Sequence, residues 1–416
     1  MTLSYIWLGF FLVAFAIAFV KWAFLNDPLV FKVIVDGIFK SAGDSVELSF
    51  KLIGIMTLFL GFMSIGERAG AIRFLSRLVG PFFSRLFPEV PRQHPAMGHM
   101  MMNFSANLLG LDNAATPFGL KAMESLQELN PKKEVASNAQ IMFLALHASG
   151  LTLIPVSIIA MRAAVKPAAA NPADIFIPCM IATFAATVAA LMIVSLKQKI
   201  NLLQPVILGW ILGISALIAA LIAYIKVFLD AAGIEQFSSV LSNGIILLIF
   251  LVFLLGALWK KINVFEAFVD GAKGGFEIAV KIIPYLVAML VAISVLRTSG
   301  AFDYLLQGMQ TLFSSMGMRT DFVSALPTAM MKPLSGSGAR GMMIDTMTKY
   351  GADSFAGRLS AIFQGSSDTT FYVIAVYFGS VAVKNTRYAI PAMLLADLVG
   401  IITAIFVAYL FFGSSL

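Results

Sequence analysis

Side chains able to bind a charged solute gather in two short stretches of the second half of the chain. The first stretch reads KPLSGSGARG and contains Lys332, Ser335, Ser337 and Arg340. Its glycines let backbone amides approach a ligand, and its two cations can bind a carboxylate or a phosphate. A half-helix beginning near Gly338 would add its positive dipole end. This stretch therefore predicts a site for an anionic group.

The second stretch lies inside an otherwise apolar segment, 358–383. Its hydrogen-bonding side chains are Gln364, Ser366, Ser367, Asp368, Thr369 and Thr370. Polar side chains cost free energy inside a membrane, so this density predicts a solute-binding role. Gln364 and Asp368 are spaced i, i+4 and would share one face of a continuous helix. Asp368 is the only acid of the segment, and we predict that it binds a coupling proton or sodium ion.

The first half of the chain contains a sparser polar set. Its members are Asn107, Asp112, Asn113, Thr116, His147 and Ser149. We predict that Asn107 and Asn113 bind hydroxyls, amides or a coupling cation, and that Asp112 is a second ion-coupling candidate. Two plainer alternatives stay open, namely His147 bonded to a neighbouring helix and Asp112-Asn113 as a capping turn between half-helices.

The composition indicates the environment in which these residues act. Of the 416 residues, 59% are hydrophobic and 12% are charged, whereas about a quarter are charged in soluble domains. We therefore expect a polytopic integral membrane protein. A single cysteine, Cys179, and three histidines exclude a disulfide framework and a Cys/His zinc cluster. We assign the net charge of +7 to loops beside anionic lipid, because no basic stripe with interleaved aromatics indicates nucleic-acid binding.

Apolar segments of about 20 residues are long enough to cross a bilayer. Nine such spans are predicted, at 3–25, 46–66, 138–161, 173–196, 204–228, 240–259, 278–296, 358–383 and 388–412. Two further regions, 96–130 and 327–352, are interrupted by Gly and Pro and are predicted to be re-entrant helical hairpins. Each follows an amphipathic stretch, 73–87 or 302–317, that is predicted to lie in the membrane interface. The predicted fold class is an all-α polytopic membrane protein.

The chain also repeats itself. The V-D-G sequence at 35–37 recurs at 269–271, and further matches follow in the same order at a slowly drifting offset. We predict two homologous repeats, 1–196 and 235–416, joined by a connecting transmembrane helix within 197–234. This odd helix would start the second copy from the opposite membrane face, which gives an inverted-topology repeat. The distribution of Lys and Arg favours a cytoplasmic N-terminus.

Three stretches resemble a known family: NLLGLDNAATPFGLKAM (107–123), PLSGSGARGMM (333–343) and QGSSDTTFYVIAVYFGSV (364–381). They are similar to the spore maturation proteins A and B, whose Gate, or nucleoside-recognition, domain is also assigned to concentrative nucleoside transporters and bacterial ferrous-iron transporters. The resemblance implies a fused protein, A-like in the first repeat and B-like in the second. It also implies a membrane location and a transporter-like hairpin architecture, without identifying a substrate.

We therefore expect a secondary transporter or facilitator that moves a small polar, anionic organic solute by alternating access. No cofactor is expected beyond a coupling proton or Na⁺. The expected partners are this solute and the lipid of a bacterial cytoplasmic membrane, and a homo-oligomer stays open. A non-transporting membrane scaffold and an envelope lipid flippase are the alternatives. An enzyme is not expected, because G-x-S-x-G, H-E-x-x-H and Walker motifs are absent, although Asp368 with His147 leaves an intramembrane enzyme as a minor alternative.

Overall fold

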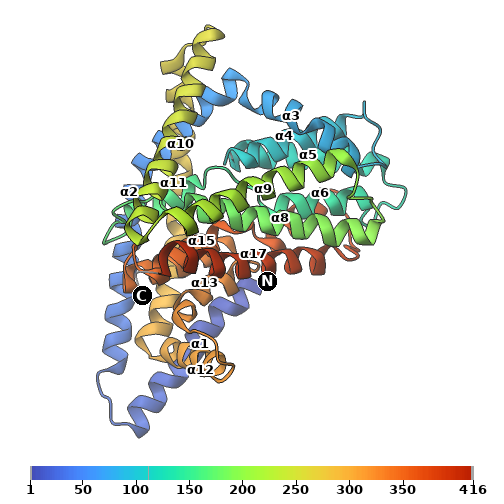
Figure 1. Cartoon of the computed structure of the whole chain (residues 1–416). Coiled ribbons are helices and arrows are strands. Elements are labelled where there is room, and N and C mark those ends of the chain that lie inside the picture. Colours follow the sequence, from blue (N-terminus) through green and yellow to red (C-terminus); the bar gives the residue numbers. More distant parts are fainter. Residues whose placement is uncertain (1, 111, 414–416) are drawn as a thin grey trace.

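The computed structural model describes residues 2–110 and 112–413, apart from the side chains of residues 2–3, 112–114, 231–232 and 235. This part of the chain is helical, with one isolated β-bridge and no strand. By length and composition, seven helices within the described residues can cross a membrane. In chain order they belong to α1 (Thr2–Phe24), α2 (Val30–Ala69), α8 (Phe176–Gln198), α9 (Pro205–Phe228), α10 (Ala231–Trp259), α11 (Val264–Thr298) and α17 (Ala389–Phe412). The predicted all-α, polytopic membrane fold is confirmed (Figure 1).

Shorter helices form where the sequence predicts interfacial helices and hairpins. In chain order they are α3 (Ala71–Leu86), α4 (Pro95–Leu108), α5 (Asp112–Leu129), α12 (Ala301–Ser315), the 3-10 helix η1 (Asp321–Ala325), α13 (Leu326–Met331) and α14 (Gly336–Tyr350). α3 and α12 are the two amphipathic helices. α4 packs on α5 as one helical hairpin, and α13 packs on α14 as the other. The depth of both hairpins in a membrane stays a prediction.

Two of the nine predicted spans, 138–161 and 358–383, are wrong as continuous helices. They are broken into the half-helices α6 (Asn138–Ser149), α7 (Val156–Ala164), α15 (Phe355–Gly365) and α16 (Thr370–Ser380). Both breaks contain residues that interrupt helical backbone. A segment that is long and apolar enough to span a membrane need not be one continuous helix. The composition alone therefore does not reveal the two breaks.

Local backbone chemistry explains the two breaks. Gly150 ends α6 with a φ of 60°, a left-handed conformation that glycine adopts without strain. Pro155, directly before α7, has no backbone N–H with which to continue the first helix. In the second segment, polar side chains after Gly365 compete for backbone groups. Asp368 Oδ1, for example, accepts a hydrogen bond from Thr369 N at 2.7 Å.

The same order of elements occurs twice, in α1–α8 and in α10–α17, with α9 between them. The long helices α2 and α11, which hold equivalent places in this order, pack along each other in antiparallel directions. Gly37 near the start of α2 lies against Thr298 at the end of α11. Gly271 near the start of α11 lies against Leu60 in the later part of α2. Equivalent long helices of the two copies therefore point in opposite directions.

The remaining long helices are arranged in the same way. α8 packs along α17, and Gln198 at the end of α8 donates a hydrogen bond to Tyr388, directly before α17, at 2.9 Å.

The first helix of each copy packs chiefly on the long second helix of the other copy. In α1, Trp7 Nε1 donates to Ala288 O of α11 at 3.0 Å, while α10 packs on α2. The two copies are thus interlocked.

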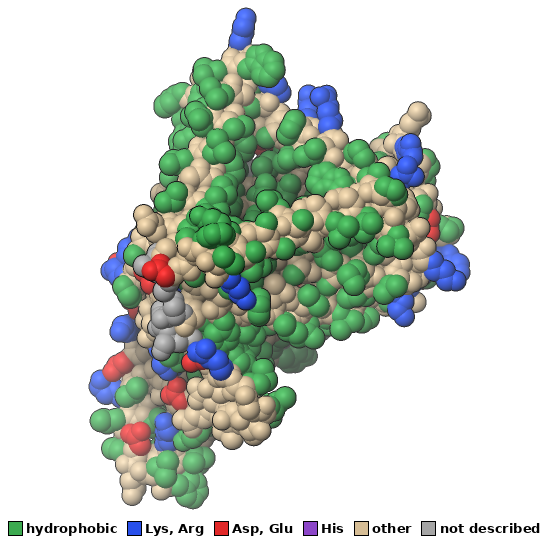
Figure 2. All heavy atoms as spheres, in the orientation of Figure 1, with side chains coloured by type: hydrophobic (Ala, Val, Ile, Leu, Met, Phe, Trp, Pro, Cys, Tyr) green, Lys and Arg blue, Asp and Glu red, His purple; other side chains and the backbone are tan. Residues whose placement is uncertain are grey.

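Hydrophobic side chains cover the visible flank formed by α8, α9 and α10, and charged side chains gather toward the ends of the molecule (Figure 2). In α9, the buried residues are Ile207, Ile218 and Ile225, so most of this apolar helix faces outward. An exposed apolar surface of this extent requires lipid rather than water. The protein is therefore a multi-pass membrane protein.

Candidate functional site

Four interruptions of the helices meet around one cavity of about 140 Å³. They are the turns of both hairpins and the breaks of both discontinuous helices, represented in the cavity wall by Gly110, Gly150, Lys332 and Asp368. Backbone hydrogen bonds hold the interruptions together: Leu153 N donates to Leu108 O, and Asp368 N donates to Ala148 O, both at 2.7 Å. Irregular backbone among apolar helices is stable only where its polar groups find partners or line a cavity. The non-helical backbone of these four interruptions is therefore gathered around the cavity.

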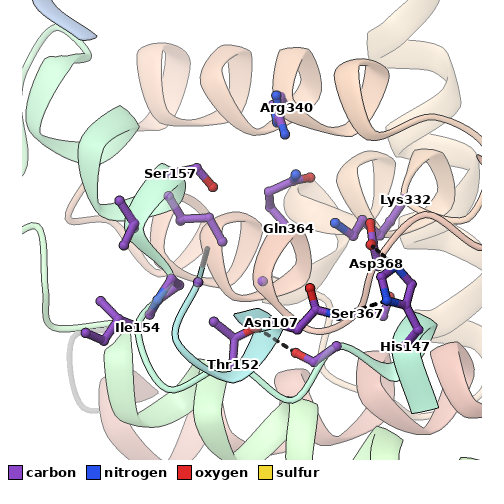
Figure 3. A pocket seen from close by; sticks show the side chains of 16 residues that line it. Asn107, His147, Thr152, Ile154, Ser157, Lys332, Arg340, Gln364, Ser367 and Asp368 are labelled. Atoms are coloured by element: carbon purple, nitrogen blue, oxygen red, sulfur yellow. Dashed lines mark hydrogen bonds and ion pairs between the residues drawn. The ribbon is translucent and has the colours of Figure 1, made fainter. Parts of the chain in front are cut away.

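Cationic and unpartnered side chains reach the cavity from the second half of the chain. Figure 3 shows Arg340 pointing from α14 toward the cavity, with Gln364 of α15 facing it and Lys332 beside Asp368. Lys332 and Gln364 are both 6% exposed. Arg340 Nε and Gln364 Oε1 are two of the four buried side-chain atoms that lack a hydrogen-bond partner among the described residues. A buried polar atom without a hydrogen-bond partner destabilises the protein by about 1–3 kcal/mol. A polar ligand that hydrogen-bonds these atoms would remove this cost, which favours its binding.

His147 lines the cavity near the end of α6, beside Asp368 (Figure 3). Its Nδ1 lies 2.8 Å from Asn107 Nδ2 and 3.0 Å from Asn103 Oδ1, so each tautomer of the ring makes one of these two hydrogen bonds. Its Nε2 lies 3.7 Å from Asp368 Oδ2, and the Tyr377 ring packs edge-on at 4.7 Å between centroids. Both interpretations of His147 hold together: the ring is bonded to a neighbouring helix and it also lines the cavity.

Asp368 lies in the break between α15 and α16, with 47% of its side chain exposed. The predicted i, i+4 helical face that it shares with Gln364 is wrong, because α15 ends at Gly365. Both side chains nevertheless line the cavity. The cavity wall also contains Ser367 and Thr152. Asp368 is therefore exposed to the cavity.

Several other predicted site residues do not line the cavity. Ser335 caps α14 by accepting from Gly338 N at 3.0 Å, and Ser337 lies 3.2 Å from Ser335 Oγ. Ser149 and Ser366 bond backbone carbonyls of their own helices, and Thr370 bonds Asp397. Thr116 lies in α5 and Thr369 directly before α16. The side chains of Asp112 and Asn113 lie outside the described residues.

The structure also reveals an acid that the sequence reasoning missed. Asp397 lies in the middle of α17 and is 3% exposed. Its Oδ2 accepts a hydrogen bond from Thr370 Oγ1 at 2.6 Å, directly behind the break between α15 and α16. The available signal was a single acid within the apolar span 388–412. Such a residue is a functional candidate by default.

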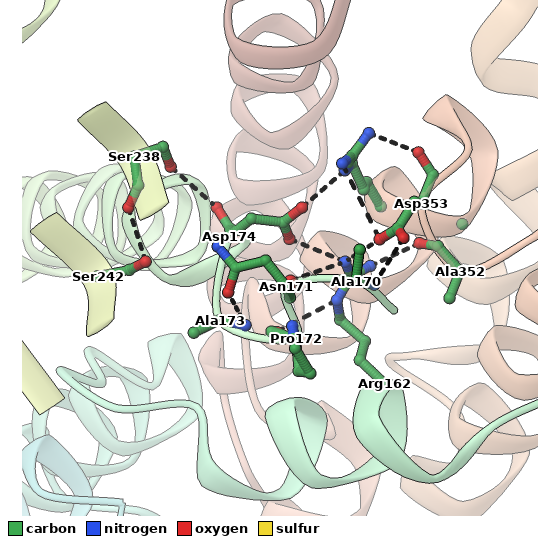
Figure 4. A network of polar contacts seen from close by, with 12 residues as sticks. Arg162, Ala170, Asn171, Pro172, Ala173, Asp174, Ser238, Ser242, Ala352 and Asp353 are labelled. Atoms are coloured by element: carbon green, nitrogen blue, oxygen red, sulfur yellow. Dashed lines mark hydrogen bonds and ion pairs between the residues drawn. The ribbon is translucent and has the colours of Figure 1, made fainter. Parts of the chain in front are cut away.

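A largely buried ionic network lies at the end of α7 and the start of α15 (Figure 4). The Arg162 network consists of Arg162, Asp174, Asp353 and Arg358. Arg162 is fully buried at the end of α7 and donates to Asp174 Oδ1 at 2.8 Å, to Asp353 Oδ1 at 3.1 Å and to Ala352 O at 2.7 Å. Arg358 of α15 donates to Asp174 Oδ2 at 2.8 Å. The network thus ties the α7–α8 connection to the α14–α15 connection.

A neutral network lies at the other ends of the broken helices. The Gln127 network consists of Gln127, Asn130 and Gln140. The Asn130 and Gln140 amides both donate to Gln127 Oε1 at 2.9 Å, and Gln127 donates to the carbonyl of Val381, just after α16, at 3.0 Å. The α5–α6 connection also pairs with the α16–α17 connection, through the 135–385 β-bridge. The two broken helices therefore run in opposite directions past the cavity, with a different network at each end.

Together these features define a multi-pass membrane protein in which two hairpins and two discontinuous helices surround one polar cavity. The Gate family, described as nucleoside recognition, matches residues 49–165 and 279–384, and the chain belongs to this family. Spore maturation protein B of Bacillus subtilis is 46% identical over 175 residues, which cover 42% of this chain and 97% of that protein. Spore maturation protein A of the same organism is 42% identical over 158 residues, covering 38% and 80% respectively. The chain is thus a member of the fused A/B type. No solved structure matches it significantly.

Proposed function

We propose that this protein is a secondary transporter or facilitator of a small polar organic solute that carries an anionic group. One observation supports this proposal most strongly: four helix interruptions converge on a cavity that is lined by Lys332 and Arg340 and by two buried polar atoms without a hydrogen-bond partner among the described residues. Discontinuous helices around a central site are the architecture by which many secondary transporters bind solute. We place the protein in a bacterial cytoplasmic membrane with its N-terminus in the cytoplasm.

The chemistry of the cavity favours the anionic class of solute. Lys332 and Arg340 can bind a carboxylate or phosphate, and Gln364 can pair with a hydroxyl or amide. The cavity of about 140 Å³ is smaller than the roughly 300–1,000 Å³ of pockets for drug-sized ligands. In this conformation it fits a small solute or the anionic part of a larger one. The family description names nucleosides, but fold-level analogy does not fix the substrate.

In an alternating-access mechanism the cavity would open in turn at each end of the two broken helices, which run in opposite directions. The broken helices lead from the cavity to the Arg162 network at one end and to the Gln127 network at the other. The first network is ionic and largely buried, whereas the second consists of neutral amides, with a separate, exposed Lys384–Glu134 ion pair at the same end. Because separating buried charges from their partners costs more than separating neutral or solvated groups, the end at the Gln127 network should open more readily.

Inverted topology predicts that α3 and α12 lie on opposite membrane faces. Arg92→Cys and Ser314→Cys, both at exposed positions, should therefore react with a membrane-impermeant maleimide from opposite sides of intact cells. The single native cysteine, Cys179, is buried and should give little background. Labelling of both variants from outside would contradict the inverted arrangement.

Solute-dependent stabilisation tests the transport function itself. Purified protein should unfold at a higher temperature with one class of compound in a screen of nucleosides, amino acids, peptides and aromatic dicarboxylates. A ligand at 100 times its Kd stabilises the folded state by about 2.7 kcal/mol. The same compound should then accumulate in proteoliposomes. A scaffold would show neither effect, and a lipid flippase would respond to lipid and not to soluble compounds.

A further inference from the structure

Asp397 lies directly behind the cavity wall. It is 3% exposed and accepts a hydrogen bond from Thr370 Oγ1 at 2.6 Å, and Ser367 of the cavity wall is a second hydrogen-bond partner. Gly400, one turn further along α17, approaches the carbonyl of Ser366. This face of α17 therefore fits into the break between α15 and α16. The carboxylate is separated from the cavity contents only by the residues of that break.

Two charged groups act on this carboxylate directly, and further titratable groups lie next to them. Lys332, at the end of α13, and Asp368, in the break, interact electrostatically with Asp397. His147 of α6 is linked to the cluster through Asp368, at 3.7 Å. Cys179 of α8 is buried and interacts with Lys332. Lys332 is the cation of this cluster and also lines the cavity, so a bound solute and Asp397 would share it.

We propose that Asp397 is the proton-binding group of the transport site and is protonated when an anionic solute engages Lys332. The inference rests on the proposed transport function. Of the two cavity cations, Lys332 and Arg340, Lys332 is the one that acts on Asp397. A solute anion that engages Lys332 therefore leaves the buried Asp397 carboxylate without its compensating charge, which is costly. On solute binding, a proton passes from water to an Asp397 carboxylate oxygen while an anionic oxygen of the solute approaches Lys332 Nζ. The total charge of the site is then the same before and after binding.

The shared lysine also favours a proton over a sodium ion. A sodium ion at Asp397 would lie close to the Lys332 ammonium, and two cations repel each other at low dielectric. A proton neutralises the carboxylate without adding a second fixed charge. Thr370 Oγ1 and Ser367 can still hydrogen-bond the neutral acid, because a hydroxyl both donates and accepts.

The variant Lys332→Gln reproduces, without any solute, the state in which the lysine charge is no longer available to Asp397. We expect this variant at neutral pH to show the infrared carbonyl band of a protonated carboxylic acid, and we expect the parent protein to lack it. Adding Asp397→Asn to Lys332→Gln should remove the band. Adding Asp368→Asn instead should leave it in place, because Asp368 is half exposed to the cavity.

The outcomes separate this inference from the transport proposal. Failure of the band to appear in Lys332→Gln, or its removal by Asp368→Asn and not by Asp397→Asn, would overturn the role of Asp397 while leaving solute-dependent stabilisation intact. Size-exclusion profiles establish that each variant is folded. If Lys332→Gln does not fold, the parent protein titrated to acidic pH supplies the same measurement. Other carboxyl groups protonate in both proteins, so the measurement is the difference between the parent and Asp397→Asn at the same pH. The parent must show one carboxylic-acid band that Asp397→Asn lacks, and identical spectra would equally overturn the proposal.

Discussion

Arg162→Met should destabilise the protein by about 3–5 kcal/mol, because it removes one partner from a buried charge network and leaves the others uncompensated. Arg162 is fully buried, and the Asp174 side chain is only 7% exposed. Domains are typically stable by about 5–15 kcal/mol, so this loss is a large share of the total. The measurement is the thermal or denaturant unfolding of the variant in detergent.

A double variant separates charge imbalance from lost packing. Arg162→Met with Asp174→Asn removes a negative charge together with the positive one and should recover part of the lost stability. Lys384→Met is the matched control, since its ion pair with Glu134 is 74% and 69% exposed on the two sides. An exposed pair contributes little, so this variant should unfold almost like the parent. Equal destabilisation by Lys384→Met and Arg162→Met would contradict the conclusion that the buried Arg162 network stabilises the protein more than an exposed ion pair does.

Arg340→Gln should weaken solute binding about tenfold to 150-fold while leaving the protein folded. Loss of a hydrogen bond to a charged group costs about 1.5–3 kcal/mol, and each 1.4 kcal/mol is tenfold in affinity. The fold should tolerate the change, because Arg340 Nε has no hydrogen-bond partner among the described residues. The measurement is the affinity of the compound that stabilises the parent most in the thermal screen.

The control for this prediction is Arg92→Gln, which removes an equally charged side chain at an exposed position before α4. It should change neither affinity nor unfolding temperature. A folded Arg340→Gln protein with parental affinity would exclude Arg340 from the solute site. A variant that unfolds instead would show that Arg340 stabilises the hairpin and not the solute.

Much of the site could be predicted from residue types alone. Polar and cationic side chains cost free energy among apolar helices. Lys332, Arg340 and Gln364 therefore indicated a binding site from their residue types, before their positions in space were known. The structure brings these three together with Asn107, His147, Ser367 and Asp368 in one cavity wall. The predicted serines of the α13–α14 turn are different. Ser335 caps a helix, because the N–H groups at a helix start need an acceptor and its hydroxyl is the nearest one.

The sequence by itself determined the membrane class, the two helical hairpins and the two amphipathic helices, whereas the interfacial position of those helices and the repeat boundaries stay predictions. The features so determined depend on local composition and on glycine and proline, which act over a few residues. Only the tertiary structure decided which apolar segments break, because a proline does not by itself identify a break: Pro284 lies inside the continuous helix α11, whereas Pro155 lies at a break. Only it placed Asp397 behind Thr370 and joined Arg162 to Asp353. Those contacts connect residues far apart in the chain, and their free energy comes from burial that the sequence does not display.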